Sequence, residues 1–291
     1  MSGGKKVQRS GLLRLLPLIF LLTLGGCTGM LTQRMGNTLA NAILNQDDPE
    51  TVRAGAPAYL LLIDGLIADN PRDKSMLLAG ARLYSAYASI FVEEGERALR
   101  MSQKARDYAR RGLCMDYPQI CANESAPYDQ FVPGLHEIEA SGLDALYVYG
   151  SAWAGYIQAD SANWAAVADL PKVEAVMRRV AAMDEGYDHG RAQLYLAVIN
   201  TLLPPAMGGR PEVGKAFFER AIALSNGQDL MAKVEYAQRY ARMIFNRALH
   251  DRLLQDVIDT DTDVPGRVLS NVLAQQKARE LLSTSTDYFM E

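Results

Sequence analysis

The sequence predicts an all-α protein, built as a helical hairpin array of degenerate tetratricopeptide-like repeats in the manner of an α-solenoid. Apolar residues recur every three and four positions nearly throughout, which is the spacing of one helix face, and alternating β-branched runs are few. Small residues also stand three positions before bulky ones, a pattern typical of closely crossing helices. An irregular all-helical domain is the alternative.

The first element is a leader in which a basic start precedes a short apolar run. The run covers residues 12–24, which is shorter than the roughly 20 residues that a membrane span needs. A basic head, an apolar middle and small residues before a cut site are the layout of a secretory signal peptide. We therefore expect residues 1–26 to be removed.

The residues at the cut site suggest a lipid anchor. Leu24, Gly25, Gly26 and Cys27 resemble the bacterial lipobox, in which the cysteine is acylated and becomes the new N-terminus. We predict lipidation at Cys27, an anchor and linker over residues 27–36 and one helical domain over residues 37–291. Thr28 stands where an aspartate would favour the inner membrane, so the outer membrane facing the periplasm is expected. An ordinary signal peptide with an incidental cysteine is the alternative.

Charge and cysteine content argue against nucleic-acid binding and against a zinc site. Removing the leader leaves 26 Lys and Arg against 34 Asp and Glu, and an acidic chain without a basic cluster argues against nucleic-acid binding. Cys114 and Cys121 are spaced for a local disulfide, with two buried free thiols as the alternative. Their spacing and the lack of further ligands nearby argue against zinc.

Helices are expected along most of the domain. Pro57 can open a helix at its first turn, with Tyr59–Ile63 buried nearly all round and Asn70 ending it. A stripe over residues 77–91 predicts the next helix. Further helices are expected over 94–113, 141–158, 171–184, 189–203, 211–225, 229–246, 248–258 and 266–283, and the longest irregular piece is expected over 114–133.

The repeat pattern nominates a partner or ligand surface. Gly80, Gly150 and Ala237 fit the small position of first helices, and first helices line the concave side of such arrays. Positions offset from these anchors should therefore face a partner, and aromatic and arginine side chains suit contact hot spots. A tyrosine at helical spacing can equally be core. The nominated residues are Tyr84, Tyr147, Gln238 and Arg242.

Three motifs resemble chemical sites but fail on detail. Gly209, Gly214 and Lys215 match a phosphate loop, but Ala216 replaces the serine or threonine that would hold magnesium. The aspartates at 259, 261 and 263 lack the glycine and glutamate of a calcium loop. The three histidines, at 136, 189 and 250, stand singly. We predict no enzymatic activity, no cofactor and no metal.

Two long stretches and the C-terminal half resemble a known family. The stretches are AILNQDDPETVRAGAPAYLLLIDGL (residues 42–66) and LLAGARLYSAYASIFVE (residues 77–93), and the C-terminal half contains LPPAMGGRPEVGKAFFERAIALSNGQDLMAKVEYAQRYAR (residues 203–242). Together they are similar to the T component of tripartite ATP-independent periplasmic (TRAP) transporters. The region of Cys114 and Cys121 looks like an elaboration of that family.

The resemblance implies a function that composition alone does not. Proteins of this family are implied to be lipid-anchored, all-helical homotrimers that bind the solute-binding P component of the transporter and aid delivery of its ligand, with no enzymatic activity. The alternative function is an outer-membrane repeat scaffold that assembles envelope or secretion complexes. The anchor and the repeats suit both, and the resemblance favours the transport accessory.

Overall fold

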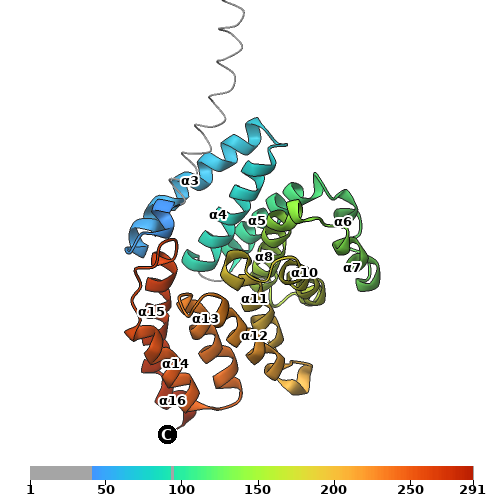
Figure 1. Cartoon of the computed structure of the whole chain (residues 1–291). Coiled ribbons are helices and arrows are strands. Elements are labelled where there is room, and N and C mark those ends of the chain that lie inside the picture. Colours follow the sequence, from blue (N-terminus) through green and yellow to red (C-terminus); the bar gives the residue numbers. More distant parts are fainter. Residues whose placement is uncertain (1–40, 93–94, 291) are drawn as a thin grey trace, which may run out of the picture.

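The computed structural model describes residues 41–92 and 95–290, and within these ranges the chain is helical with no strand. The predicted all-α class is confirmed, whereas the repeat arrangement stays a proposal. The predicted signal peptide, Cys27 and the linker lie outside the described residues (Figure 1). The helices are α3 (Pro49–Asp69), α4 (Lys74–Phe91), α5 (Glu96–Cys114), α6 (Pro118–Ala122), α7 (Tyr128–His136), η1 (Ala140–Gly142), α8 (Leu143–Ala159), α9 (Trp164–Val167), α10 (Leu170–Met183), η2 (Tyr187–Gly190), α11 (Arg191–Asn200), η3 (Pro205–Met207), α12 (Pro211–Leu224), α13 (Leu230–Glu235), η4 (Tyr236–Ala241), α14 (Arg247–Asp259), α15 (Val268–Ser283) and α16 (Ser285–Phe289).

The first described long helix begins earlier than predicted. α3 starts at Pro49, after an N-cap in which Asp48 accepts a hydrogen bond from the backbone N–H of Glu50, and Pro57 lies inside it. Proline has no N–H to donate to the carbonyl four residues earlier. That carbonyl, of Arg53, accepts a hydrogen bond from the Tyr87 hydroxyl at 3.3 Å instead. The prediction that Pro57 opens the helix is therefore wrong.

α3 also buries one face only, contrary to the prediction for Tyr59–Ile63. Leu60 and Ile63 are buried against the core, whereas Leu61 is 74% exposed and Leu62 is 56% exposed. Among the described residues α3 is long and apolar enough to cross a membrane by length and composition alone. Its packing against α4 and α15 is that of a helix of the folded domain.

The segment predicted to be irregular, residues 114–133, contains helical structure instead. α6 and α7 are both short, and α6 begins at a proline, Pro118, while α7 follows Pro127. Phe131 and Leu135 of α7 are buried and drive its docking, and the Phe131 ring lies edge-on to Trp153 at 5.9 Å. Cys114 and Cys121 are paired as a disulfide across the turn between α5 and α6, with their Cα atoms 6.0 Å apart.

Successive helices stack on one another. α4 packs on α5, α5 on α8, α8 on α10, α10 on α11 and α11 on α12. Small residues sit where helices cross, as predicted for Gly150, because a Cβ there would lie 2.6 Å from Cγ1 of Val176 on α10. At Gly80 a Cβ would lie 2.9 Å from the Tyr108 ring of α5. These crossings fix the helix positions on which the site depends.

The first and the last long helices of the described chain lie close together. The start of α3 lies beside the top of α15 in Figure 1, and the N–H of Gly266, just before α15, donates to Oδ1 of Asn45 at 2.7 Å. Leu269 of α15 joins the main hydrophobic core, which otherwise runs from α3 to α11. A second core lies between α13, α14 and α15. The N- and C-terminal parts therefore share one packed structure.

Candidate functional site: a tyrosine cluster at a left-handed turn

Three tyrosine rings from three elements come together around α8. Tyr147 of α8 lies edge-on to Tyr187 of η2 at 5.2 Å between ring centroids, and to Tyr195 of α11 at 6.3 Å. We call these three residues the tyrosine cluster. Edge-to-face rings at such distances attract one another beyond their buried area. Of the four nominated residues, only Tyr147 belongs to this cluster.

The cluster lies against a strained turn. Asp188, His189 and Gly190 follow one another in the left-handed region, with φ of 46°, 57° and 81°. Each non-glycine residue held there costs about 1–3 kcal/mol, and such outliers gather at functional sites. Asp188 is held in place because its Oδ2 accepts a hydrogen bond from the Tyr147 hydroxyl at 3.1 Å. The turn thus presents a carboxylate beside the rings.

A buried charge network continues from this turn. Nε of Arg191 lies 3.3 Å from Oδ2 of Asp229, and Nη1 of Arg267 lies 3.0 Å from the same oxygen. Asp229 is 4% exposed, and its Oδ1 has no hydrogen-bond partner within the described part of the chain. The Arg191 side chain remains 32% exposed. The network therefore holds a cation beside the tyrosines that solvent can reach.

Burial raises the pKa of the tyrosine hydroxyls in the cluster further above physiological pH. Burial raises the pKa of Tyr147, and the nearby Tyr195 and Asp188 raise it further. Burial also raises the pKa of Tyr195. Both phenols therefore stay neutral at physiological pH. The Tyr147 hydroxyl donates its proton to Asp188, so it can only accept a further hydrogen bond, whereas the Tyr195 hydroxyl can donate one. The tyrosine rings can pack on aromatic or apolar groups of a partner or ligand, and the phenol hydroxyls and the partly exposed Arg191 guanidinium can form hydrogen bonds with its polar groups.

Tyr84 lies in a different place. Its side chain is 7% exposed, and its hydroxyl donates to Oδ2 of Asp64 at 2.7 Å, while Tyr108 donates to Oδ1 at 2.7 Å. Lys104 pairs with the same carboxylate. Burial opposes the charge on Asp64, but these donors outweigh it and lower its pKa. Tyr84 therefore fastens α3 to α4 and α5, as the core alternative for a tyrosine implies.

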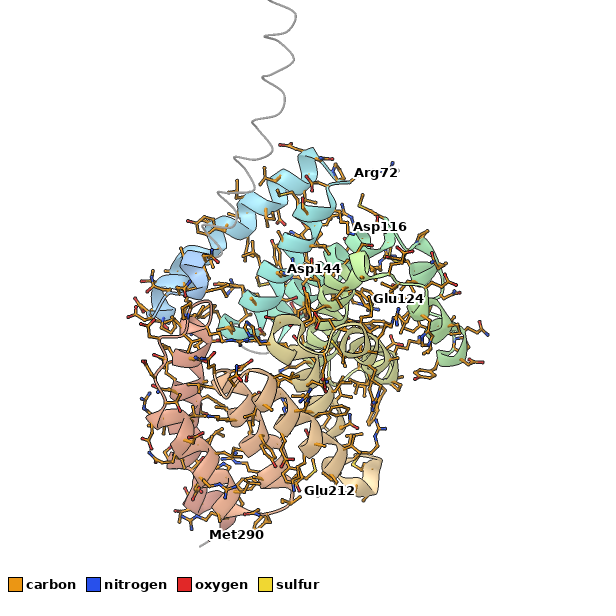
Figure 2. The ribbon with its side chains drawn as sticks, in the orientation of Figure 1. Arg72, Asp116, Glu124, Asp144, Glu212 and Met290 are labelled. Atoms are coloured by element: carbon orange, nitrogen blue, oxygen red, sulfur yellow. A yellow bond between two sulfur atoms is a disulfide. The ribbon has the colours of Figure 1, made fainter. Side chains whose placement is uncertain are left out.

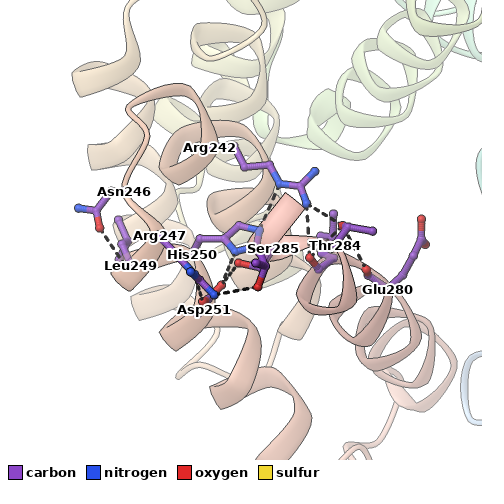
Figure 3. Close-up of polar contacts among 11 residues, drawn as sticks. Arg242, Asn246, Arg247, Leu249, His250, Asp251, Glu280, Thr284 and Ser285 are labelled. Carbon is purple, nitrogen blue, oxygen red and sulfur yellow. Dashed lines mark hydrogen bonds and ion pairs between the residues drawn. The ribbon is translucent and has the colours of Figure 1, made fainter. Parts of the chain in front are cut away.

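Gln238 and Arg242 lie on the helix that runs through η4, where Tyr236–Ala241 form a π-helical turn. Figure 3 shows polar contacts of the Arg242 side chain with α14 and with the turn between α15 and α16. We call the residues that make these contacts, with their neighbours listed below, the C-terminal clamp. Arg242 donates to Nε2 of His250 at 3.2 Å and to the Thr284 hydroxyl at 3.3 Å, and its guanidinium lies 4.4 Å from the centre of the Tyr288 ring. The clamp residues are Arg242, Arg247, His250, Asp251, Thr284, Ser285 and Tyr288.

The clamp contains a serine, a histidine and an aspartate, but not in a catalytic arrangement. The Ser285 hydroxyl donates to Oδ1 of Asp251 at 2.6 Å, and Nδ1 of His250 lies 2.8 Å from the same oxygen. A serine nucleophile would need its hydroxyl on the free nitrogen of the histidine. Arg242 occupies that nitrogen. The clamp therefore ties α14 to α15 and α16.

Comparisons with known proteins identify the family of this chain. A family model, the TRAP transporter T-component, matches residues 45–289. The chain belongs to this family. It is also 24% identical over 270 residues to an uncharacterized protein of Treponema pallidum (strain Nichols), covering 84% of this chain and 82% of that protein. Membership assigns an accessory role in a TRAP transporter and indicates association with the cell envelope, and the T-component family is not a known enzyme family.

In this T component the segments that resemble a phosphate loop and a calcium loop have structural roles. Gly214 lies at a helix crossing, where a Cβ would lie 3.0 Å from the Ala197 carbonyl oxygen and closer still to Thr201. Asp261 accepts a hydrogen bond from the N–H of Asp263 in the turn before α15. Within the residues that the structure describes, no group of His, Cys, Asp and Glu could hold a metal ion.

Sequence reasoning missed most of the site. Tyr187, Asp188, Tyr195 and Arg191 were not nominated, because they lie about forty residues from Tyr147 and face it only through helix packing. One local signal was present: the run YDHG at residues 187–190 combines an aspartate with a glycine, two residues that tolerate left-handed backbone.

Proposed function

We propose that this T component is a periplasmic, lipid-anchored accessory that binds the solute-binding P component of its TRAP transporter through the tyrosine cluster and aids delivery of the ligand. Family membership over residues 45–289 carries the proposal. The strained turn at Asp188 and His189 supports this location, because backbone strain of this kind is retained where function depends on it.

The proposed anchor is the acylated Cys27. Cleavage after residue 26 would leave this cysteine at the N-terminus, followed by a linker to residue 36 and a single domain over residues 37–291. Several acyl chains on one residue hold a protein firmly, at about 0.8 kcal/mol for each buried methylene. We place the protein on the outer membrane, facing the periplasm, as a homotrimer.

The helix array suits such a role. We infer that the hairpins form degenerate tetratricopeptide-like repeats, because consecutive helices pack pairwise with small residues at their crossings. Arrays of this type bind partners along the side lined by first helices. α8 and α11 carry Tyr147 and Tyr195. The Tyr195 phenol and the Arg191 guanidinium offer donors to carbonyl and carboxylate groups of the P component, and Tyr147, whose proton is donated to Asp188, offers its ring and a phenol oxygen that can accept.

Co-purification from the native envelope tests this proposal. The full-length chain with a C-terminal tag would be solubilised in detergent and used as bait, and the retained proteins identified by mass spectrometry. We expect a TRAP solute-binding component to be retained, and to be lost when Tyr147 and Tyr195 are changed to alanine. Trp164→Ala is the matched control, because Trp164 is an aromatic residue that is 81% exposed outside the cluster.

The opposite result has a clear meaning. Retention of assembly or secretion factors without a solute-binding protein would support the scaffold function instead. If Trp164→Ala abolished retention of the solute-binding component as fully as the tyrosine changes do, removal of any exposed aromatic residue would have the same effect. The tyrosine cluster would then no longer be the proposed binding surface.

A further inference from the structure

A second candidate surface lies where the turn between α3 and α4 meets the C-terminal end of α5. An open pocket of about 410 Å³ is found there, away from the tyrosine cluster. Figure 2 labels Arg72 and Asp116 at this upper corner of the molecule. Arginines make up three of the seven lining residues, and none is acidic. The lining residues are Pro71, Arg72, Leu77, Arg110, Arg111, Cys114 and Met115.

The positive charge of the pocket is only partly neutralised. Arg72 has no ion pair or hydrogen bond within the residues that the structure describes. Nε of Arg110 is 4.0 Å from Oε2 of Glu124, whose other oxygen Arg106 already binds. Arg111 pairs with Asp107 at 3.4 Å on the exposed helix surface. On a chain with a net charge of −4, this pocket is a local positive site.

The rest of the pocket is apolar. Leu77 forms a buried floor and Met115 is 45% exposed beside it. The bridge from Cys114 to Cys121 fixes the chain that carries Met115 against the end of α5. Arginine and methionine are both enriched in protein interfaces relative to other surface. An arginine fork also binds a carboxylate with two parallel hydrogen bonds.

We propose that this pocket docks an acidic, aliphatic segment of a protein partner. A carboxylate side chain would lie between Arg72 and Arg110, and a neighbouring leucine or isoleucine would cover Met115. A protein segment fits better than a small molecule, because small-molecule pockets enclose most of their ligand, whereas the Arg110 side chain is 42% exposed and open to one side. The net negative charge of the rest of the chain repels acidic partners elsewhere, which makes this pocket specific.

The proposal goes beyond the proposed function, since it concerns a different surface. Its test uses a defined probe, a short fluorescein-labelled peptide of alternating glutamate and leucine. Fluorescence anisotropy would be measured with the full-length chain in detergent at low salt. We expect saturable binding that weakens as salt is raised, and about tenfold weaker binding for Arg72→Glu, the loss expected of an arginine hot spot.

Matched controls separate the pocket from general charge. Arg252→Glu makes the same charge change at an exposed arginine that also has no ion pair among the described residues. This arginine belongs to α14, a helix at the opposite end of the molecule from the turn between α3 and α4 (Figure 1). The Arg252→Glu variant should bind the probe as the parent chain does. A peptide of alternating glutamine and leucine should bind at least tenfold more weakly. Thermal unfolding of Arg72→Glu should match that of the parent, because Arg72 is exposed.

Three results would overturn the proposal. The first is the absence of saturable binding of the acidic probe by the parent chain. The second is equal weakening by Arg72→Glu and Arg252→Glu, which would mean that net charge alone decides binding. The third is equal binding of the glutamine peptide, which would mean that the carboxylates are not recognised.

Discussion

The tyrosine cluster and the C-terminal clamp contain similar residue types, but the polar groups of the clamp are bonded within the protein, whereas part of the tyrosine cluster is exposed. In the clamp, both ring nitrogens of His250 and the side chain of Asp251 have partners inside the protein (Figure 3). In the tyrosine cluster, two consecutive non-glycine residues keep left-handed backbone, and Arg191 stays partly exposed. Left-handed non-glycine backbone occurs in both regions, because Phe245 beside the clamp has φ of 58° with its ring packed on Phe289. The tyrosine cluster differs in that its left-handed residues carry exposed polar side chains, which can contact a partner together with the partly exposed Arg191 guanidinium. The difference marks which region can serve recognition.

The largest expected change in the free energy of unfolding follows from removing the Asp229 carboxylate, which pairs with Arg191 beside the tyrosine cluster. Asp229→Ala leaves the Arg191 and Arg267 guanidinium groups without their common partner. Removing one partner of a buried ion pair costs about 3–5 kcal/mol. We expect the free energy of unfolding, measured in urea, to fall by about that amount.

The control for this change is an ion pair on the surface. Glu96→Ala removes the partner of Arg100, and the Glu96 side chain is 92% exposed. Exposed pairs contribute about 0–1 kcal/mol. Equal losses in the two variants would show that the Asp229 network is no more than a surface feature.

The clamp should make stability depend on pH. Burial lowers the pKa of His250 below its usual 6.5, so the folded protein holds the neutral imidazole and the unfolded chain takes up the proton first. Stability should therefore be full above about pH 6.5 and should fall as the pH drops from there through the lowered pKa. We expect the free energy of unfolding to decrease between neutral and mildly acidic pH.

Unfolding in urea at several pH values checks this prediction. His250→Gln should flatten the dependence in that window, because no titrating group then replaces the imidazole. His136→Gln, at an exposed histidine outside the clamp, is the matched control variant. Below that window a further loss is expected as Asp251 is protonated. Burial opposes its charge, but hydrogen bonds from Ser285, His250 and Arg247 outweigh that effect and lower its pKa.

The smallest predicted effect concerns backbone strain in the two regions. His189 is exposed with φ of 57°, so His189→Gly should raise the free energy of unfolding by up to about 1 kcal/mol. Phe245 has nearly the same φ, 58°, but its ring contacts Phe289 at 5.3 Å. Phe245→Gly should therefore destabilise the protein. Stabilisation of both variants in thermal unfolding would contradict this distinction.

Much of the fold could be predicted, because helix periodicity is local. The expected helices over 141–158, 171–184 and 211–225 differ from α8, α10 and α12 by at most two residues at either end. The start of α3 has a local signal, because Asp48 is an N-cap residue directly followed by Pro49. What no local pattern shows is that Pro57 can lie inside the helix, because the carbonyl that it leaves free is satisfied by Tyr87, thirty residues further along the chain.

The candidate site was harder to predict for two physical reasons. Tyr187 and Tyr195 meet Tyr147 only after α8, α10 and α11 have packed, which no local pattern records. The prediction for Gln238 and Arg242 assumes ordinary helical spacing from Ala237. The π-helical turn over Tyr236–Ala241 widens the helix there, and one extra residue turns the following side chains by about 100°.

The central claim is that the tyrosine cluster, and not the clamp, recognises the P component. The most direct test is the affinity of the purified P component for the full-length chain, measured by isothermal titration calorimetry. Tyr147→Ala should weaken binding about tenfold or more, as at interface hot spots, while Tyr288→Ala, at a 40% exposed tyrosine of the clamp, should leave it unchanged. Unchanged affinity for Tyr147→Ala, or a larger loss for Tyr288→Ala, would contradict the account.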